Sequence, residues 1–173
     1  IIPSIRAAEL GDIVHLSSSS GVTAARVGER EQIARVSSGS DELLADPAVD
    51  LVVIATPHAS HGPLVVQALE AGKHGYVEKP LDITDDQLGA VVEALARSDG
   101  QLHVGFNRRW SPMVAAAREA LGGGAGPIVV DYRVNAGPVA PDHWYADRRE
   151  GGRLLGEVCH FIDTAGAIID REP

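Results

Sequence analysis

Apolar residues occur along this sequence in short continuous runs that alternate with segments in which they recur every three or four positions. The clearest run covers residues 51–55 and is rich in β-branched side chains. Such a run predicts a strand covered on both faces in a parallel sheet. Shorter apolar runs predict strands at residues 13–16, 75–77 and 102–106, and a loop is expected at residues 17–21.

The segments between these runs carry helix signals. Pro63 suits the first turn of a helix that stops at Gly72. Thr84 suits the N-cap of the next helix, with Gln87 three residues later. The apolar face expected for that second helix consists of Leu88, Val91, Val92 and Leu95.

The chain opens on an apolar pattern without a capping residue, so it is expected to begin inside a helix. This first helix would stop at Gly11. Its expected buried stripe consists of Ile2, Ile5 and Leu10. Two further helical stretches are expected at residues 22–30 and 41–45.

The alternation of strands and helices predicts an α/β domain with a doubly wound parallel sheet, in which ligands bind beyond the carboxyl ends of the strands. Residues 128–134 instead alternate apolar and polar side chains, as a half-exposed antiparallel strand does. We therefore expect one domain at residues 1–106 and the start of a second at residues 107–173. The glycines at 122–124 are interpreted as a helix end, because no strand precedes them as it would a phosphate loop.

A last helix is expected near the C-terminal end, and its residues separate onto two sides at about 100° per residue. The apolar side consists of Val158, Phe161, Ile162, Ala165, Ile168 and Ile169. The opposite side consists of Glu157, His160, Asp163 and Thr164. This arrangement places His160 within one turn of two carboxylates.

Composition excludes several classes of protein. Hydrophobic residues make up 45% of the 173 positions and charged residues 23%, which is typical of a folded globular protein. The formal net charge of -9 gives no support to nucleic-acid binding. No apolar run approaches the roughly 20 residues that span a bilayer, and the single Cys159 cannot form an internal disulfide. A cytoplasmic location without a membrane partner is expected.

Three motifs stand at predicted strand ends or on the last helix: TPHASH at residues 56–61, VEKP at 77–80 and EGGRLLGEVCHFID at 150–163. Together they resemble the glucose-fructose oxidoreductase/inositol dehydrogenase (Gfo/Idh/MocA) family. The resemblance implies a Rossmann-like dinucleotide-binding domain, followed by an α/β domain with a largely antiparallel sheet. It also implies that the first strand and its glycine-rich turn are missing before Ile1, that the second domain is cut short, and that cofactor affinity is impaired.

Within this resemblance, Lys79 is the expected general acid/base, because an amine at a strand end beside the nicotinamide can exchange a proton with a substrate hydroxyl. Glu78 and Pro80 are expected beside the cofactor with Lys79, and the family suggests a cis peptide bond before Pro80. The alternative is a surface lysine paired with Glu78.

His160 is the second expected catalytic residue, and it is expected to bind substrate together with Glu157 and Lys79. The family often has Asp four residues before this histidine, where the present sequence has Gly156. The alternative makes His160 a helix-packing residue and the neighbouring acids a solvated face.

The TPHASH loop is expected to contact the nicotinamide ribose. The residues concerned are Thr56, Pro57, His58 and His61. The family commonly has Asn where His58 stands, and His61 could instead support the loop. A zinc site at this His-x-x-His spacing is disfavoured because no cysteine or acidic ligands accompany it.

Further contacts are expected from three places along the chain. Ser18, at the predicted end of the family's second strand, is compatible with the ribose of NAD or NADP. Asn107 and Arg108 could face the cofactor or an anionic substrate, although an inter-domain salt bridge by this segment is an equal alternative. Trp144 offers either an aromatic wall to a sugar ring or a packing anchor for its loop.

The resemblance implies an NAD(P)-dependent oxidoreductase that transfers hydride to or from a secondary alcohol of a sugar, cyclitol or sugar derivative. The partner is then a small polyol or sugar-type molecule, and a homo-oligomer is expected. A catalytically inactive nucleotide-binding regulatory or structural module is the alternative, motivated by Gly156 and the missing glycine-rich turn.

Overall fold

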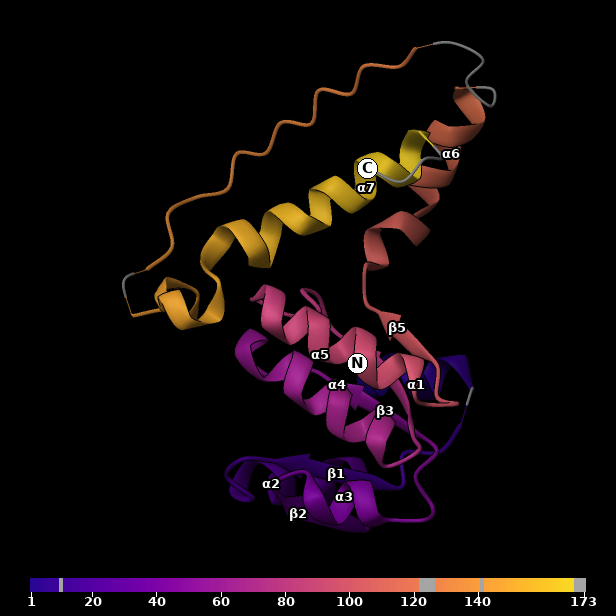
Figure 1. Ribbon diagram of the computed structural model, residues 1–173, viewed down its shortest axis with the longest axis vertical. Helices are drawn as coiled ribbons and strands as arrows, with labels where there is room; N and C mark the ends of the chain where they lie inside the picture. The colour runs from indigo at the N-terminus through magenta and orange to yellow at the C-terminus, as the bar shows by residue number, and fades with distance from the viewer. Residues whose placement is uncertain (10, 122–126, 141, 170–173) are drawn as a thin grey trace.

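The computed structural model describes residues 1–9, 11–121, 127–140 and 142–169. After helix α1 (Ile2–Ala8), strands and helices alternate through the first two thirds of the chain (Figure 1). The strands are β1 (His15–Ser18), β2 (Arg35–Ser38), β3 (Leu51–Ile54), β4 (His74–Val77) and β5 (Leu102–Val104). The helices between them are α2 (Val22–Glu31), α3 (Asp41–Ala45), α4 (His61–Glu70) and α5 (Asp85–Ala96). The predicted α/β class is confirmed.

All described strand pairs are parallel. Strands β1 and β2 form one sheet, and β3, β4 and β5 form a second sheet in that order. The classic dinucleotide-binding sheet has the order 3-2-1-4-5-6, with its first strand between the second and the fourth. The two sheets of this chain correspond to the 3-2 and 4-5-6 parts of that order, as the prediction of a sheet without its first strand requires.

The core lies between the three-stranded sheet and helices α4 and α5. Its fully buried members come from both layers and are Ile54, Val65, Leu69, Val77, Val91 and Ala94. Helix α5 begins as predicted, because the Thr84 side chain accepts a hydrogen bond from the Gln87 backbone N–H at 3.2 Å. Gly72 ends α4 with φ 72°, a conformation that favours glycine.

Two features of the smaller sheet differ from the sequence predictions. Strand β1 begins at His15 and includes Ser17 and Ser18, which were expected in a loop. Strand β2 was not expected, because Val36 is the only strongly apolar residue in it. It forms through parallel pairing with β1 in register from His15 with Arg35 onward, and local hydrophobic pattern does not report such pairing.

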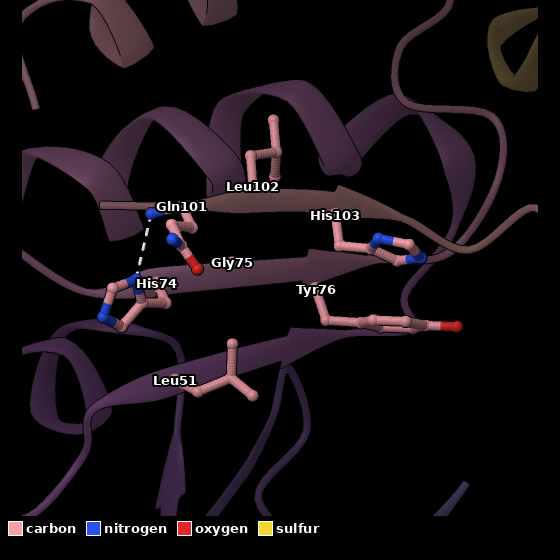
Figure 2. A pocket seen from close by; sticks show the side chains of 7 residues that line it. All are labelled: Leu51, His74, Gly75, Tyr76, Gln101, Leu102 and His103. Atoms are coloured by element: carbon pink, nitrogen blue, oxygen red, sulfur yellow. Dashed lines mark hydrogen bonds between the residues drawn. The ribbon is translucent and has the colours of Figure 1, made fainter. Parts of the chain in front are cut away.

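The expectation that residues 51–55 are covered on both faces is wrong for the described structure. Leu51 is 52% exposed, and one face of the sheet is open around Tyr76 and His103, whose rings stack at 5.4 Å (Figure 2). Helices α4 and α5 cover the opposite face. The apolar composition of β3 therefore does not distinguish one covered face from two.

The predicted apolar faces of two helices are also only partly buried. In α5, Val91 and Ala94 are buried, whereas Leu88, Val92 and Leu95 are exposed. In α1, Ile2 and Ile5 are half-buried, and Leu10 lies outside the described residues. Both helices therefore contact the rest of the chain over less of their surface than their periodicity predicts.

Beyond β5 the chain forms η2 (Asn107–Trp110) and helix α6 (Pro112–Ala120). It then forms the short turns η3 (Trp144–Ala146), η4 (Arg148–Glu150) and η5 (Leu154–Val158), the last a turn of π-helix, before helix α7 (Cys159–Ile169). In the described ranges, no helix is long and apolar enough to cross a membrane. The glycines at 122–124 lie outside the described residues.

The antiparallel strand predicted at residues 128–134 is not formed in the described structure. The segment is extended but pairs with none of the described strands, and a strand needs a neighbour for its backbone N–H and C=O groups. The exposure of its side chains still alternates, since Val129 is 94% exposed whereas Val130 is 38% exposed. The ring of Tyr132 stacks on that of Phe161 in α7 at 5.4 Å.

Helix α7 keeps the two predicted sides but buries the opposite one. His160 and Thr164 are buried, whereas Ile162 is 50% exposed. The reason is that α7 packs on α6 and η2 through the side that carries His160. The side of α7 that carries His160 is therefore the packed one, as in the alternative that makes His160 a helix-packing residue.

Candidate active site

The carboxyl ends of the parallel strands β3, β4 and β5 lie at one edge of their sheet, where Thr56, Lys79 and Asn107 follow them. Pairing continues just past two of these ends. The Glu78 N–H donates to the Ile54 carbonyl at 2.9 Å, and the Gly105 N–H donates to the Val77 carbonyl at 2.7 Å. Backbone hydrogen bonds thus hold the main chain in place as far as Glu78, the residue before Lys79.

The Lys79 amine reaches from this edge to the C-terminal part of the chain. Its Nζ donates to the Gly156 carbonyl oxygen at 2.6 Å and to the Tyr145 hydroxyl at 3.3 Å. The Tyr145 hydroxyl in turn donates to the same carbonyl oxygen at 3.2 Å. These three polar groups form a closed triangle, which we call the Lys79 triangle.

Gly156 is buried in the π-helical turn η5, and π-helical turns often occur at functional sites. A Cβ atom at this position would lie 2.5 Å from Tyr145 Cε1 and 2.7 Å from His58 Cε1. The absence of a side chain therefore allows the tyrosine and histidine rings to approach this backbone. The carboxylate that the resemblance places at this position could not fit beside both rings.

His58 is only 3% exposed and lies among aromatic rings. Its ring centroid is 4.7 Å from that of Trp144 and 5.3 Å from that of Tyr145. Its Nδ1 hydrogen-bonds the Glu150 carbonyl at 3.0 Å, and the Glu150 carboxylate accepts from the Ala59 N–H. Burial lowers the pKa of His58, and the nearby charges of His61 and Lys79 add to that shift.

His61 holds two loops of the site together. It is 1% exposed, and its ring nitrogens lie 2.7 Å from the Pro80 carbonyl and 2.8 Å from the Thr56 carbonyl. The peptide bond between Lys79 and Pro80 is cis, as the resemblance suggests. His61 thus has the supporting position that was weighed for it.

His160 is 8% exposed and stands one turn after the carbonyl that Lys79 contacts. Burial lowers its pKa, and the positive charges of Arg108 and Lys79 lower it further. Its Nδ1 is buried and has no hydrogen-bond partner in the described part of the chain. A buried ring nitrogen without a partner costs about 1–3 kcal/mol, which a ligand hydroxyl would offset.

The carboxylates expected beside His160 have guanidinium partners instead. Glu157 accepts from Arg153 at 3.1 Å. Asp163 pairs with Arg109 through two contacts, of 2.8 and 3.2 Å. The segment after β5 thus forms a salt bridge through Arg109, but both partners lie within residues 107–173, so it is not the inter-domain salt bridge that the sequence left open.

The remaining expected site residues lie outside the Lys79 triangle. The Arg108 guanidinium lies over the Phe161 ring at 4.9 Å, and Asn107 is exposed. Ser18 is the last residue of β1, where its hydroxyl accepts from the Ala24 N–H at 3.2 Å. Pro57 is exposed, and its carbonyl accepts from the Ser60 N–H.

Sequence reasoning missed two contributors to the site. The Tyr145 hydroxyl contacts Lys79, and Glu150 joins its loop to the one that carries His58. The available signal for both was the string of polar and aromatic residues between Asp142 and Glu150, where only Trp144 was considered. Trp144 stacks on Tyr145 at 4.4 Å and is 45% exposed, so it packs within its loop and also presents part of its side chain at the surface.

The spacing of His58 and His61 does not produce a metal site. Both His61 nitrogens contact carbonyl oxygens, and no group of three His, Cys, Asp or Glu side chains arranged for a metal ion occurs among the described residues. The hollow on the open face of the sheet is lined by other residues, including Tyr76 and His103 (Figure 2). The predicted site residues therefore gather at the strand ends rather than in that hollow.

Residues 2–106 match the model of the family described as "Oxidoreductase family, NAD-binding Rossmann fold". The match covers more than half of the 173-residue chain. The chain belongs to this Gfo/Idh/MocA family. Within it, the chain is 36% identical over 148 residues to scyllo-inositol 2-dehydrogenase (NAD(+)) of Bacillus subtilis, and 32% identical over 134 residues to inositol 2-dehydrogenase of Rhizobium meliloti.

Those alignments cover 82% and 77% of this Gfo/Idh/MocA chain, but only 39% and 40% of the two relatives. The chain thus spans about two fifths of the length of the curated relatives that it matches. Among solved structures, it resembles levoglucosan dehydrogenase in complex with NADH and levoglucosan, with a TM-score of 0.77 and 29% identity over 90% of this chain and 45% of the other. A probable dehydrogenase from Thermotoga maritima has the same fold, with a TM-score of 0.79 and 23% identity over 98% of this chain and 51% of the other.

Proposed function

We propose that the full-length gene product that carries this sequence transfers hydride reversibly between NAD(P) and a secondary alcohol of a sugar, cyclitol or sugar derivative. Membership of the oxidoreductase family supports the reaction class. The names of the relatives, which include inositol and levoglucosan dehydrogenases, support the substrate class. The observation that carries the proposal is the hydrogen bond from Lys79 to the Gly156 carbonyl. It joins an amine at a strand end to η5, which continues into the helix that carries His160.

Lys79 is the proposed general acid/base. In alcohol oxidation, its neutral amine takes the proton of the substrate hydroxyl while hydride leaves the carbon that bears this hydroxyl. In the reverse direction, its ammonium returns that proton to the carbonyl oxygen. A bound nicotinamide would supply the hydride acceptor or donor.

His160 is the proposed orienting residue for the reacting hydroxyl. Its lowered pKa favours the neutral imidazole, which has one donor and one acceptor nitrogen. The buried Nδ1, which has no partner among the described residues, is the atom that a substrate hydrogen bond would satisfy. Glu157 is a weaker candidate for substrate binding because it pairs with Arg153.

The residues at the strand ends fit a dinucleotide. Ligands of doubly wound folds bind beyond the carboxyl ends of the strands, where Ser18, Thr56 and Glu78 are found. Trp144 is 45% exposed and stacks on Tyr145 of the Lys79 triangle, so its ring can contact a sugar ring there. Ser18 brings no charge to a ribose, so both NAD and NADP remain within the proposal.

The test is an absorbance assay of NAD(P)H turnover with the full-length gene product on a panel of cyclitols, sugars and sugar derivatives. Lys79→Ala should lower kcat by about 100-fold or more, since a general acid/base contributes 10²–10⁴-fold. Lys73→Ala is the matched control, because Lys73 contacts the Asp46 carbonyl instead. Cofactor binding without turnover on any substrate would support the inactive binding module.

The domain division after residue 106, the cytoplasmic location and the homo-oligomeric state stay predictions. Limited proteolysis would test the division, and sedimentation analysis would test the oligomeric state. A monomer in solution would contradict the expected assembly without bearing on the chemistry.

A further inference from the structure

We propose that Tyr145 and the Gly156 carbonyl position the Lys79 amine for proton transfer, each by accepting one of its hydrogens. This inference rests on the proposed hydride-transfer function and adds a positioning residue to it. The distances that carry it are 2.6 Å from Nζ to the Gly156 oxygen and 3.3 Å from Nζ to the Tyr145 hydroxyl.

The number of hydrogens on the amine determines what the triangle can do. A neutral lysine amine has two hydrogens and one lone pair, and the ammonium has three hydrogens. The Gly156 and Tyr145 oxygens accept two hydrogens in both states. The third position on Nζ is therefore the lone pair before proton transfer and the new N–H bond after it.

The proton balance of the step follows directly. The substrate O–H bond breaks and the third N–H bond forms, while the hydride and its electron pair pass to the nicotinamide. The two fixed hydrogen bonds stop the amine from rotating, so this third position keeps one direction throughout. The Tyr145 hydroxyl hydrogen takes no part, because it is donated to the Gly156 carbonyl at 3.2 Å.

Packing holds Tyr145 in this position. Its ring lies 4.4 Å from that of Trp144 and 5.3 Å from that of His58. It also fills the space that a side chain at Gly156 would need, since a Cβ there would lie 2.5 Å from Tyr145 Cε1. The phenol and the glycine therefore work as a pair, and a phenol, unlike a carboxylate, brings no negative charge to the amine.

The kinetic test compares Tyr145→Phe with Tyr132→Phe in the full-length gene product. Tyr145→Phe should lower kcat by about tenfold with KM nearly unchanged, which is the loss of one hydrogen bond to a charged group. The acidic limb of the pH profile of kcat/KM should move to lower pH, because the ammonium loses an acceptor. Tyr132→Phe also removes a phenol hydroxyl, but from a ring that stacks on Phe161. It should change neither kcat nor the pH profile of kcat/KM.

A second measurement does not require activity. Lys73 and Lys79 are the two lysines of this sequence, and acetylation of each can be followed by peptide mass spectrometry. Tyr145→Phe should raise the labelling rate of Lys79 severalfold relative to Lys73 at the same pH, and Tyr132→Phe should leave the ratio unchanged. If the wild-type protein turned over no substrate, the proposed function would fail, yet this ratio would still test the contact.

Three results would overturn the inference. One is an unchanged Lys79 labelling ratio in a Tyr145→Phe protein that unfolds at the wild-type temperature. Another is a rise in KM without a fall in kcat, which would make Tyr145 a substrate contact. The third is an equal loss of activity in Tyr132→Phe, which would indicate a general structural effect.

Discussion

Replacement of Gly156 by alanine tests the packing on which the candidate site depends. The added Cβ would lie 2.5 Å from Tyr145 Cε1 and 2.7 Å from His58 Cε1. Neither ring can move away freely, because His58 bonds the Glu150 carbonyl and Tyr145 stacks on Trp144. Overpacking of this kind costs about 1–3 kcal/mol. Alanine favours helix over glycine by about 1 kcal/mol, so the free energy of unfolding should fall by up to about 2 kcal/mol.

Gly89→Ala provides a control of opposite sign. Gly89 is an exposed residue within α5, and nothing lies within 4 Å of the Cβ that alanine would add. Only the helix preference of alanine then acts, so the free energy of unfolding of this variant should rise by about 0.5–1 kcal/mol. Thermal unfolding, monitored by circular dichroism, measures both changes. For a chain of this size, each kcal/mol shifts the Tm by roughly 2–4 °C. If Gly156→Ala unfolded above the wild-type temperature, as Gly89→Ala should, the close approach of the rings would be refuted.

Three further predictions concern the supporting structure. Arg35 holds the pKa of Asp46 well below its usual range, so stability should fall as pH drops below about 4, and Asp46→Asn should flatten that dependence in urea unfolding. His61→Phe removes the contacts of the ring nitrogens with the Pro80 and Thr56 carbonyls and should lower the free energy of unfolding by about 1–3 kcal/mol in the same measurement. Arg109→Ala and Asp163→Ala should couple by about 1 kcal/mol or less in a double-mutant cycle, and less in high salt.

The sequence was most informative where a local signal is strong. The β-branched run of β3, the Thr84 cap and Gly72 each occupy the predicted place, because backbone preference acts there within a few residues and, in β3, Ile54 is also buried. Strand β2 could not be predicted, since its polar residues are held by pairing with β1. The alternation at residues 128–134 has no neighbouring strand in the described chain, so pattern alone did not produce a strand.

The site shows the same division. Lys79 and His160 could be selected from motifs, and the structure places them in one region of the molecule. Periodicity does not point to Tyr145, because its contact with Lys79 joins positions 66 residues apart. Its place in the polar and aromatic string between Asp142 and Glu150 is the signal that the sequence offers. The two predicted sides of the last helix do not indicate the pairing of Glu157 with Arg153, because Arg153 precedes the residues of both sides.

The contacts of the Lys79 triangle have a consequence for the order of assembly. Lys79 and Gly156 are 77 positions apart, and His58 and Glu150 are 92 apart, so each contact closes a long loop at an entropic cost. The parallel sheet can form without either contact. In the full-length gene product, the proposed hydride transfer should therefore be lost at a lower urea concentration than the three-stranded sheet, and a denaturant series that follows both signals would show two separate midpoints.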